Sequence, residues 1–185
     1  MQFTKGSISN IEFPAALWEE LLSTCRRKLA GSYLPGETRE KKVFGLLAGT
    51  LTGDILRISA VAPLLRNARS LPSRKAFMDE IMAQHAIASE TPLEQRGWVA
   101  DPEELQKILA KFREARFQLA GSYHMHRVPW QHDLERDTPT ELDTILGKES
   151  RMFMFIISMV KPEAPVIRAF FEGKENLEVP IIRVK

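Results

Sequence analysis

The sequence predicts an α/β (α+β) protein with a mixed central β-sheet flanked by helices. Apolar runs of strand length recur along the chain, and segments with helical spacing separate only some of them. The order is not a regular βαβ alternation, which favours a mixed sheet. With 185 residues the chain is long enough for one domain with a sizeable core and short for two. We therefore expect one domain over residues 1–185.

The N-terminal half begins with a predicted strand, Ile8–Phe13, followed by a helix that starts near Pro14. After a polar loop over residues 31–41, residues 43–51 and 55–62 form a predicted hairpin around the turn Thr52-Gly53-Asp54. Residues of about 70–97 combine a short helical pattern with polar, proline-containing sequence. We interpret them as an insertion or flap, because they are long for a passive loop.

The C-terminal half begins with a helix signal, Asp101-Pro102-Glu103-Glu104, in which Asp101 can cap and Pro102 suits the first turn. Residues 117–126 then have the pattern of a strand, and a loop covers residues 127–137. Thr138 is expected to open another helix that runs to about Leu146. Residues 152–160, 166–171 and 177–184 complete the chain as predicted strands.

Composition excludes several classes of function. The 26 basic and 24 acidic residues are scattered along the chain, so nothing indicates binding to nucleic acid or to an anionic membrane. The amino terminus lacks the apolar run of a signal peptide, and no run of about 18 apolar residues predicts a membrane span. Cys25 is the only cysteine, which excludes an internal disulfide and a cysteine-rich zinc site. We expect a cytoplasmic protein, while the oligomeric state is not indicated.

The pattern His124-Met125-His126 is the main candidate for chemistry. Residues i and i+2 of a strand point to the same face, so the two imidazoles can converge on one metal ion. Asp137, eleven residues beyond His126, can return to them from a helix start, although His132 and Asp133 lie close enough in sequence to compete. Two histidines and one carboxylate leave a position open for water, as in catalytic zinc sites.

These residues resemble the H-x-H-x7-S-x-x-D signature of the JAMM/MPN (Mov34/PAD-1, JAB-domain) metalloprotease family. Further motifs of the chain are similar to that family in the same order: Val43-Phe-Gly-Leu-Leu-Ala-Gly49, Trp98 to Leu105, and Gly121-Ser-Tyr-His124. The resemblance implies an MPN/JAB-like fold with cytidine-deaminase-like layering, and zinc held by His124, His126 and Asp137. It also implies hydrolysis of an isopeptide or peptide bond in a ubiquitin-like or small sulfur-carrier protein.

The chain departs from the family pattern at two functional positions. Lys42 occupies the place of the glutamate that would shuttle a proton, and a lysine is normally protonated at neutral pH. Leu134 occupies the place of the serine that would stabilise an oxyanion, and it cannot donate a hydrogen bond. Glu40 is the substitute base to consider, since it lies on the same strand face as Lys42, about 7 Å along the strand.

Three functions follow from these observations. The first is a zinc-dependent metallopeptidase or isopeptidase that acts on the tail of a ubiquitin-like or sulfur-carrier protein. The alternative is a catalytically impaired binding or scaffold domain of the same fold, which Lys42 and Leu134 support. A third is a zinc hydrolase for a small substrate, with its base supplied by Glu40 or by the 73–96 segment.

Overall fold

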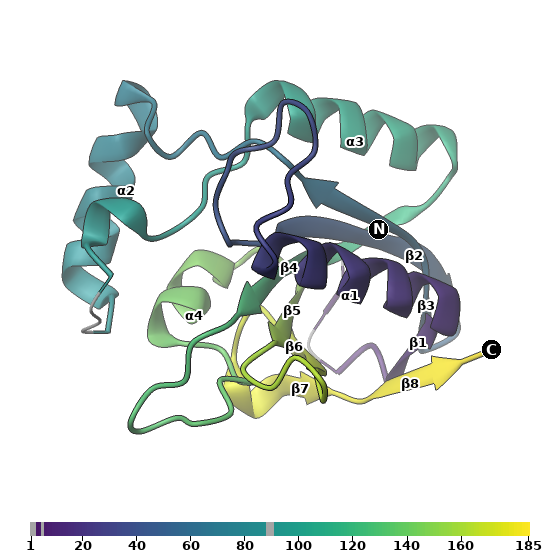
Figure 1. The fold of residues 1–185 in the computed structure, drawn as a ribbon. Helices are drawn as coiled ribbons and strands as arrows, with labels where there is room; N and C mark the ends of the chain where they lie inside the picture. Colours follow the sequence, from purple (N-terminus) through teal and green to yellow (C-terminus); the bar gives the residue numbers. More distant parts are fainter. Residues whose placement is uncertain (1–2, 5, 88–90) are drawn as a thin grey trace.

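The structure is a computed structural model of the chain and describes residues 3–4, 6–87 and 91–185. The described residues form one sheet of eight strands with helices on both sides (Figure 1). The strands are β1 (Asn10–Pro14), β2 (Phe44–Thr52), β3 (Ile55–Leu64), β4 (Gln118–His126), β5 (Phe153–Ser158), β6 (Val166–Phe171), β7 (Glu178–Val179) and β8 (Ile181–Val184).

The sheet has the order β7-β6-β5-β4-β2-β3-β1-β8. Strand β1 runs parallel to β3 and β8, and β4 runs parallel to β5. The pairs β2–β3, β2–β4, β5–β6 and β6–β7 are antiparallel. The prediction of a mixed sheet flanked by helices is confirmed.

The last predicted strand, residues 177–184, differs from the structure. Leu177 belongs to a 3-10 turn, η2 (Glu175–Leu177), and Pro180 separates β7 from β8. Because proline cannot donate to a strand ladder, pairing changes at this point. Strand β7 pairs with β6 at one edge of the sheet and β8 with β1 at the other. One residue thus links the two edges, which requires the sheet to curl.

Helices α1 (Ala15–Leu29) and α3 (Pro102–Glu114) pack on opposite faces of the sheet. Alternation along β2 shows the division, because Leu47 lies in the core under α1, while Leu46 and Ala48 lie in the core under α3. Helix α4 (Glu141–Gly147) follows β4, and α2 (Pro72–His85) stands beside α4 at one side of the molecule (Figure 1). No helix among the described residues is long and apolar enough to cross a membrane.

The segment expected as an insertion, about residues 70–97, contains α2 and a 3-10 turn, η1 (Leu93–Gln95). Residues 88–90 of that segment lie outside the described residues. Arg69 is buried at its start and donates hydrogen bonds to the carbonyls of Arg96 and Leu93. Its guanidinium also pairs with Asp79 of α2 at 2.5 Å. These contacts fix the two ends of the segment to each other.

Two local predictions agree with the structure. The Asp101 carboxylate accepts a hydrogen bond from the Glu104 amide at 2.9 Å, which caps α3 as expected. Cys25 is fully buried on α1, and burial raises the pKa of its thiol to about 12. Since the thiolate is the reactive form, Cys25 is an inert core residue.

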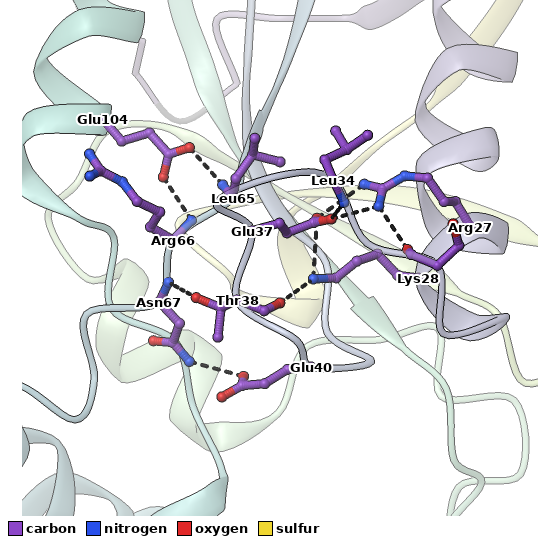
Figure 2. Close-up of polar contacts among 11 residues, drawn as sticks. Arg27, Lys28, Leu34, Glu37, Thr38, Glu40, Leu65, Arg66, Asn67 and Glu104 are labelled. Carbon is purple, nitrogen blue, oxygen red and sulfur yellow. Dashed lines mark hydrogen bonds and ion pairs between the residues drawn. The ribbon is translucent and has the colours of Figure 1, made fainter.

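A buried ion-pair network fixes the loop between α1 and β2 (Figure 2). The Glu37 carboxylate contacts the Arg27 guanidinium at 2.6 Å and the Lys28 ammonium at 3.2 Å, and it accepts a hydrogen bond from the Leu34 amide. The Lys28 and Glu37 side chains are each only 2% exposed. Lys28 also donates to the carbonyl of Thr38 at 3.0 Å. The loop that leads to Lys42 and β2 is therefore held against α1.

The same loop is joined to the end of β3. The Thr38 hydroxyl accepts a hydrogen bond from the Asn67 amide at 2.9 Å, and the Glu104 carboxylate of α3 accepts from the amides of Leu65 and Arg66. Figure 2 shows these contacts running from α1 through the loop to α3. Three segments distant in sequence are thus fixed together before β2 begins.

Two motif glycines allow close contacts at the centre of the sheet. A Cβ on Gly45 would lie 2.2 Å from a ring carbon of Tyr123, and a Cβ on Gly121 would lie 1.8 Å from the carbonyl oxygen of Phe153. Both clashes are far inside van der Waals contact, so a side chain at either position would displace β4. With the glycines in place, Tyr123 and Met125 point into the core under α1. His124 and His126 therefore face the opposite side of the sheet.

Replacing Glu37 with glutamine is expected to destabilise the protein by about 3–5 kcal/mol, because Lys28 would be left as a buried charge without a carboxylate. Chemical denaturation of Glu37→Gln measures this loss. Glu19→Gln is the matched control, since Glu19 pairs with Arg183 at the surface and such pairs contribute about 0–1 kcal/mol. Equal stability of the two variants would contradict a structural role for the network.

The same carboxylate predicts a pH dependence of stability. Burial by itself raises the pKa of Glu37, but hydrogen bonds from Arg27, Leu34 and Lys28 outweigh it and lower the pKa from 4.5 to about 2. The unfolded chain then binds a proton more readily than the folded one between these values. The contribution of Glu37 is thus complete above about pH 4.5 and is lost as the pH falls toward 2. Denaturation across this range should show a shallower decline in Glu37→Gln than in the wild type.

Candidate metal centre

Strand β4 brings the two candidate histidines to one place. His124 pairs in register with Phe44 of β2 and with Ile156 of β5, so it lies near the middle of the sheet. The His124 ring stacks on the Phe44 ring with centroids 5.4 Å apart and planes inclined by 17°. The Phe44 ring also stacks on the Trp98 ring, with centroids 5.2 Å apart. Each histidine is 7% exposed. The strand thus presents two ordered, buried imidazoles on one face.

Helix α4 supplies a carboxylate to the same place. Thr140 caps the helix, and Asp143 is the third helical residue, so the two form a reciprocal capping box. The Asp143 Oδ2 atom accepts hydrogen bonds from the Thr140 amide and hydroxyl, both at 2.8 Å. Its Oδ1 atom lies 3.4 Å from the Nε2 atom of His124. The cap therefore orients the carboxylate toward the histidines.

The three side chains form a cluster with the spacing of a metal site. The Nε2 atoms of His124 and His126 are 3.0 Å apart, and Asp143 Oδ2 is 3.9 Å from His126 Nε2. Ligand atoms 2.0–2.1 Å from a tetrahedral zinc ion lie about 3.3 Å from one another. The separations of 3.0 Å between the two Nε2 atoms and 3.4 Å between His124 Nε2 and Asp143 Oδ1 lie close to this value. These are the residues of a three-ligand cluster able to hold a metal ion.

The hydrogen bonds of His126 support the same interpretation. Its Nδ1 atom lies 2.9 Å from the carbonyl oxygen of Arg136. A carbonyl only accepts, so Nδ1 carries the proton and the Nε2 lone pair of a neutral His126 is free. A backbone partner of this kind is the usual way in which a metal-binding histidine is oriented. The two facing Nε2 atoms can then share one proton or one metal ion.

Electrostatics favour a neutral pair of imidazoles beside an ionised carboxylate. Burial lowers the pKa of His124, and burial together with the neighbouring His124 lowers the pKa of His126 to about 3, against the opposing effect of Asp143. Burial opposes ionisation of Asp143, but the two histidines and the Thr140 hydrogen bonds keep its pKa below the usual value. At neutral pH the cluster therefore presents two neutral imidazoles and one negative charge, and a cation would displace the proton that the two Nε2 atoms share.

The structure does not bring Asp137 to this cluster. The Asp137 carboxylate pairs with Arg168 of β6 at 3.1 Å. The helix that was expected to open at Thr138 instead has Thr140 as its cap, so the carboxylate that reaches the histidines comes from six residues further along. The signal was present in the sequence, because Thr140-x-x-Asp143 has the spacing of the S-x-x-D half of the signature. The signature allows seven residues between the second histidine and the hydroxyl residue, and this assumed loop length led to Asp137 instead of Asp143.

The two alternative ligands also lie outside the cluster. The Asp133 carboxylate accepts a hydrogen bond from the Arg136 amide at 2.8 Å, and the His132 ring packs beside the Trp130 ring at 5.4 Å. Both residues belong to the loop that joins β4 to α4, which is six residues longer than the signature predicts. Their contacts are those of a folded loop.

The contacts of the residues at the expected base and oxyanion positions differ from what catalysis would need. Lys42 lies two residues before Phe44, the first residue of β2, and lines the cavity at the histidines. Its ammonium donates to the carbonyls of Gln95 and Gly97 at 2.5 and 3.3 Å. Glu40 pairs with Lys42 at 2.9 Å and accepts a hydrogen bond from Asn67, and it does not line the cavity at the histidines. Leu134 is 65% exposed and also lies outside this cavity.

A cavity of about 220 Å³ opens at the cluster. One wall comes from the 70–97 segment, through Met82, Thr91, Gln95, Arg96 and Gly97. The remainder comes from the start of β2, the end of β4, the loop after β4, and α4 with its cap. The expected insertion therefore forms part of the site. His85 of α2 lies 3.1 Å from Glu141 of α4, which joins the segment to the helix that carries Asp143.

The cavity has a strongly cationic lining. Lys42, Arg96, Arg127 and Arg136 contribute positive side chains, whereas Asp143 is the only carboxylate among the described residues that line it. Trp130 also lines it, and its ring is covered by the Arg136 guanidinium at 3.1 Å from the centroid. Burial lowers the pKa of Arg136 to about 10, with Asp133 and Asp143 acting in the opposite direction, so the guanidinium is charged at neutral pH.

Comparisons with known proteins show the fold but no family. No protein-family model matches the chain, and no curated protein is significantly similar to it. Protein DSY2949 of Desulfitobacterium hafniense has a solved structure with 21% identity and a TM-score of 0.60 over 95% of this chain and 93% of its own. A protein of Salinibacter ruber has 17% identity and a TM-score of 0.50 over 94% and 92%.

The similar solved structures also include AF2198 of Archaeoglobus fulgidus, described as a JAB1/MPN domain protein. It has 12% identity and a TM-score of 0.44, with 94% of this chain and 99% of the other covered. The chain therefore has the overall fold of the Desulfitobacterium and Salinibacter proteins over nearly its whole length.

Substitution of the three clustered side chains is expected to abolish metal binding. Because each supplies one donor atom, His124→Ala, His126→Ala and Asp143→Ala should each lower zinc affinity more than about 100-fold, since even the partners that orient ligands contribute 10–100-fold. Calorimetric titration of metal-free protein with zinc measures the effect. Asp137→Ala is the matched control and should retain wild-type affinity. A loss in Asp137→Ala with none in Asp143→Ala would restore the ligand set expected from the signature.

Proposed function

We propose that the protein binds zinc through His124, His126 and Asp143 and is a JAMM-type metal-dependent peptidase or isopeptidase. The observation that carries this proposal is the cluster of two buried imidazoles and one half-buried carboxylate that line a cavity. Zinc held by two histidines and a carboxylate keeps a position open for water and lowers the pKa of that water to about 7.

The motif resemblance supports the same class of reaction. The signature places two histidines on a strand and an acidic residue three positions after a hydroxyl residue. Thr140 and Asp143 correspond to the second half of the signature. The chain thus has H-x-H on strand β4 and T-x-x-D at the start of helix α4, and the side chains of His124, His126 and Asp143 meet in space. The Thr140 hydroxyl lines the cavity and donates to Asp143, so it orients a ligand where Leu134 cannot.

For the substrate we propose the flexible tail of a ubiquitin-like or small sulfur-carrier protein, as the resemblance implies. A cavity of about 220 Å³ is far too small for a folded protein but accepts a few residues of extended chain. Around it, Trp130, Val128 and Leu142 offer apolar surface for such a segment. The histidine face and the cationic lining would then contact the backbone of the tail.

One observation favours a second candidate, a metal-loaded domain that holds such a tail without cutting it. The side chain at the expected glutamate position, Lys42, is engaged with two carbonyls of the 70–97 segment and with Glu40. Within the described part of the chain no glutamate lines the cavity, and Asp143 is the only carboxylate placed there to take a proton. In this second candidate, Lys42 holds the segment over the site instead of taking part in chemistry.

Cleavage of a tail peptide separates the two candidates. We expect zinc-loaded wild-type protein to release product from ubiquitin-like or small sulfur-carrier proteins that carry a C-terminal extension, as detected by mass spectrometry. The rate should fall more than about 100-fold in Asp143→Asn and should be unchanged in Asp137→Asn. Glu40→Gln should retain the rate, because Glu40 does not line the cavity.

The outcome in Lys42→Glu completes the test. If only this variant cuts, while the wild type binds the tail and leaves it intact, the wild-type protein is the binding domain. Lys42→Met is the control for loss of the ammonium alone, because it removes the contacts to Gln95 and Gly97 without supplying a carboxylate.

A further inference from the structure

Arg136 is a buried cation that the metal cluster does not explain. Its side chain lines the cavity and the residue is only 7% exposed. The Nε atom is buried and has no hydrogen-bond partner. Among the described residues no carboxylate lies within ion-pair distance of its guanidinium, whereas most arginines this deeply buried are paired.

The surroundings hold this guanidinium in place instead of neutralising it. The Trp130 ring covers one of its faces, so only the edge remains available for hydrogen bonds. Its own amide donates to Asp133, and its carbonyl accepts from His126, which fixes the backbone on both sides. The φ angle of Arg136 is +49°, a left-handed conformation that costs a non-glycine residue free energy. Strain and an unpaired buried cation together indicate a functional position.

Other cations around the cavity strengthen the case for an anionic ligand. The Arg96 side chain lines the same cavity and has no hydrogen-bond or ion-pair partner among the described residues. Lys42 is already engaged with Glu40 and two carbonyls. Two arginines are thus available, and a guanidinium edge presents paired N–H groups that match the two oxygens of a carboxylate.

We propose that Arg136, with Arg96 beside it, forms a carboxylate-binding subsite next to the His124–His126–Asp143 cluster. The ligand that enters the cavity carries a carboxylate, and the guanidinium of Arg136 donates hydrogen bonds that hold it. A carboxylate fits better than a phosphate dianion, because Asp143 lines the same cavity and offsets part of the positive charge of Arg136 and Arg96. Its role in selecting a substrate rests on the proposed function, whereas the binding itself does not require a metal.

The subsite is tested with pairs of probes that differ only in charge. Acetylglycine and acetylglycinamide are titrated into metal-free and zinc-loaded protein, alongside a tripeptide, Ala-Gly-Gly, with a free or an amidated C-terminus. Hydrogen bonds to a charged group lead us to expect affinities about 10-fold or more higher for the free carboxylates. The first pair represents a small organic acid and the second a polypeptide end, so the tighter pair identifies the source of the carboxylate.

The NMR signal of the Arg136 side chain shows whether the carboxylate binds at this residue. The Nε–H signal of this buried side chain in the ¹H–¹⁵N spectrum, assigned by its loss in Arg136→Lys, should shift when the free carboxylates bind and stay in place with the amides. Arg136→Met should weaken carboxylate binding about 10-fold or more, and Arg113→Met, on the exposed surface of α3, should not. Thermal melting of each variant shows that it is folded, and the acid–amide comparison in the wild type needs no variant.

The remaining outcomes of these titrations either contradict the carboxylate subsite or support it. Equal affinity for acid and amide, or a free-carboxylate complex in which the Arg136 signal does not move, would overturn the subsite. Inorganic phosphate binding more tightly than either carboxylate would overturn the choice of ligand. If zinc does not bind while carboxylates still do so at Arg136, the proposed metal function fails and the subsite stands. If zinc binds and carboxylates do not, the reverse holds.

Discussion

The packing of Tyr123 across Gly45 is the contact on which the arrangement of the site depends. It fixes the pairing of β2 with β4 at the centre of the sheet, because a side chain at position 45 would occupy the space of the tyrosine ring. With Tyr123 committed to the core under α1, strand alternation turns His124 and His126 to the other face. The same register places Phe44 opposite His124, and Lys42 lies two residues before Phe44. One close contact in the core thus sets the positions of the histidines and of the residue opposite them.

The charges at the cluster and in the cavity have complementary roles. Asp143 is a carboxylate whose side chain is 13% exposed and whose hydrogen bonds come from its own helix cap. A cation between the histidines would complete its environment. Arg136 is the opposite case, a buried cation whose backbone is anchored to His126 and Asp133. A ligand with an oxyanion beside a bound metal ion would satisfy both. The 70–97 segment, held by Lys42, limits access to this space.

Much of the fold could be predicted because local patterns agreed with tertiary packing. The hairpin at Gly53, the α3 cap at Asp101 and the strand that carries His124 all follow from residues close in sequence. Asp143 could not be placed from the loop length, because the path from β4 to α4 contains six more residues than the signature allows. The division of the last strand at Pro180 depends on the two sheet edges meeting, which is a property of the whole sheet. The pairing of Glu40 with Lys42 and Asn67 is likewise a tertiary contact that spacing does not reveal.

The central claim is that one metal ion is held by His124, His126 and Asp143. The most direct test is an anomalous difference map from a zinc-loaded crystal, recorded on both sides of the zinc absorption edge. The account predicts one strong peak within about 2.0–2.2 Å of both Nε2 atoms and of an Asp143 oxygen. A peak coordinated by Asp137 or Asp133, or no peak at the histidines in fully zinc-treated protein, would contradict it.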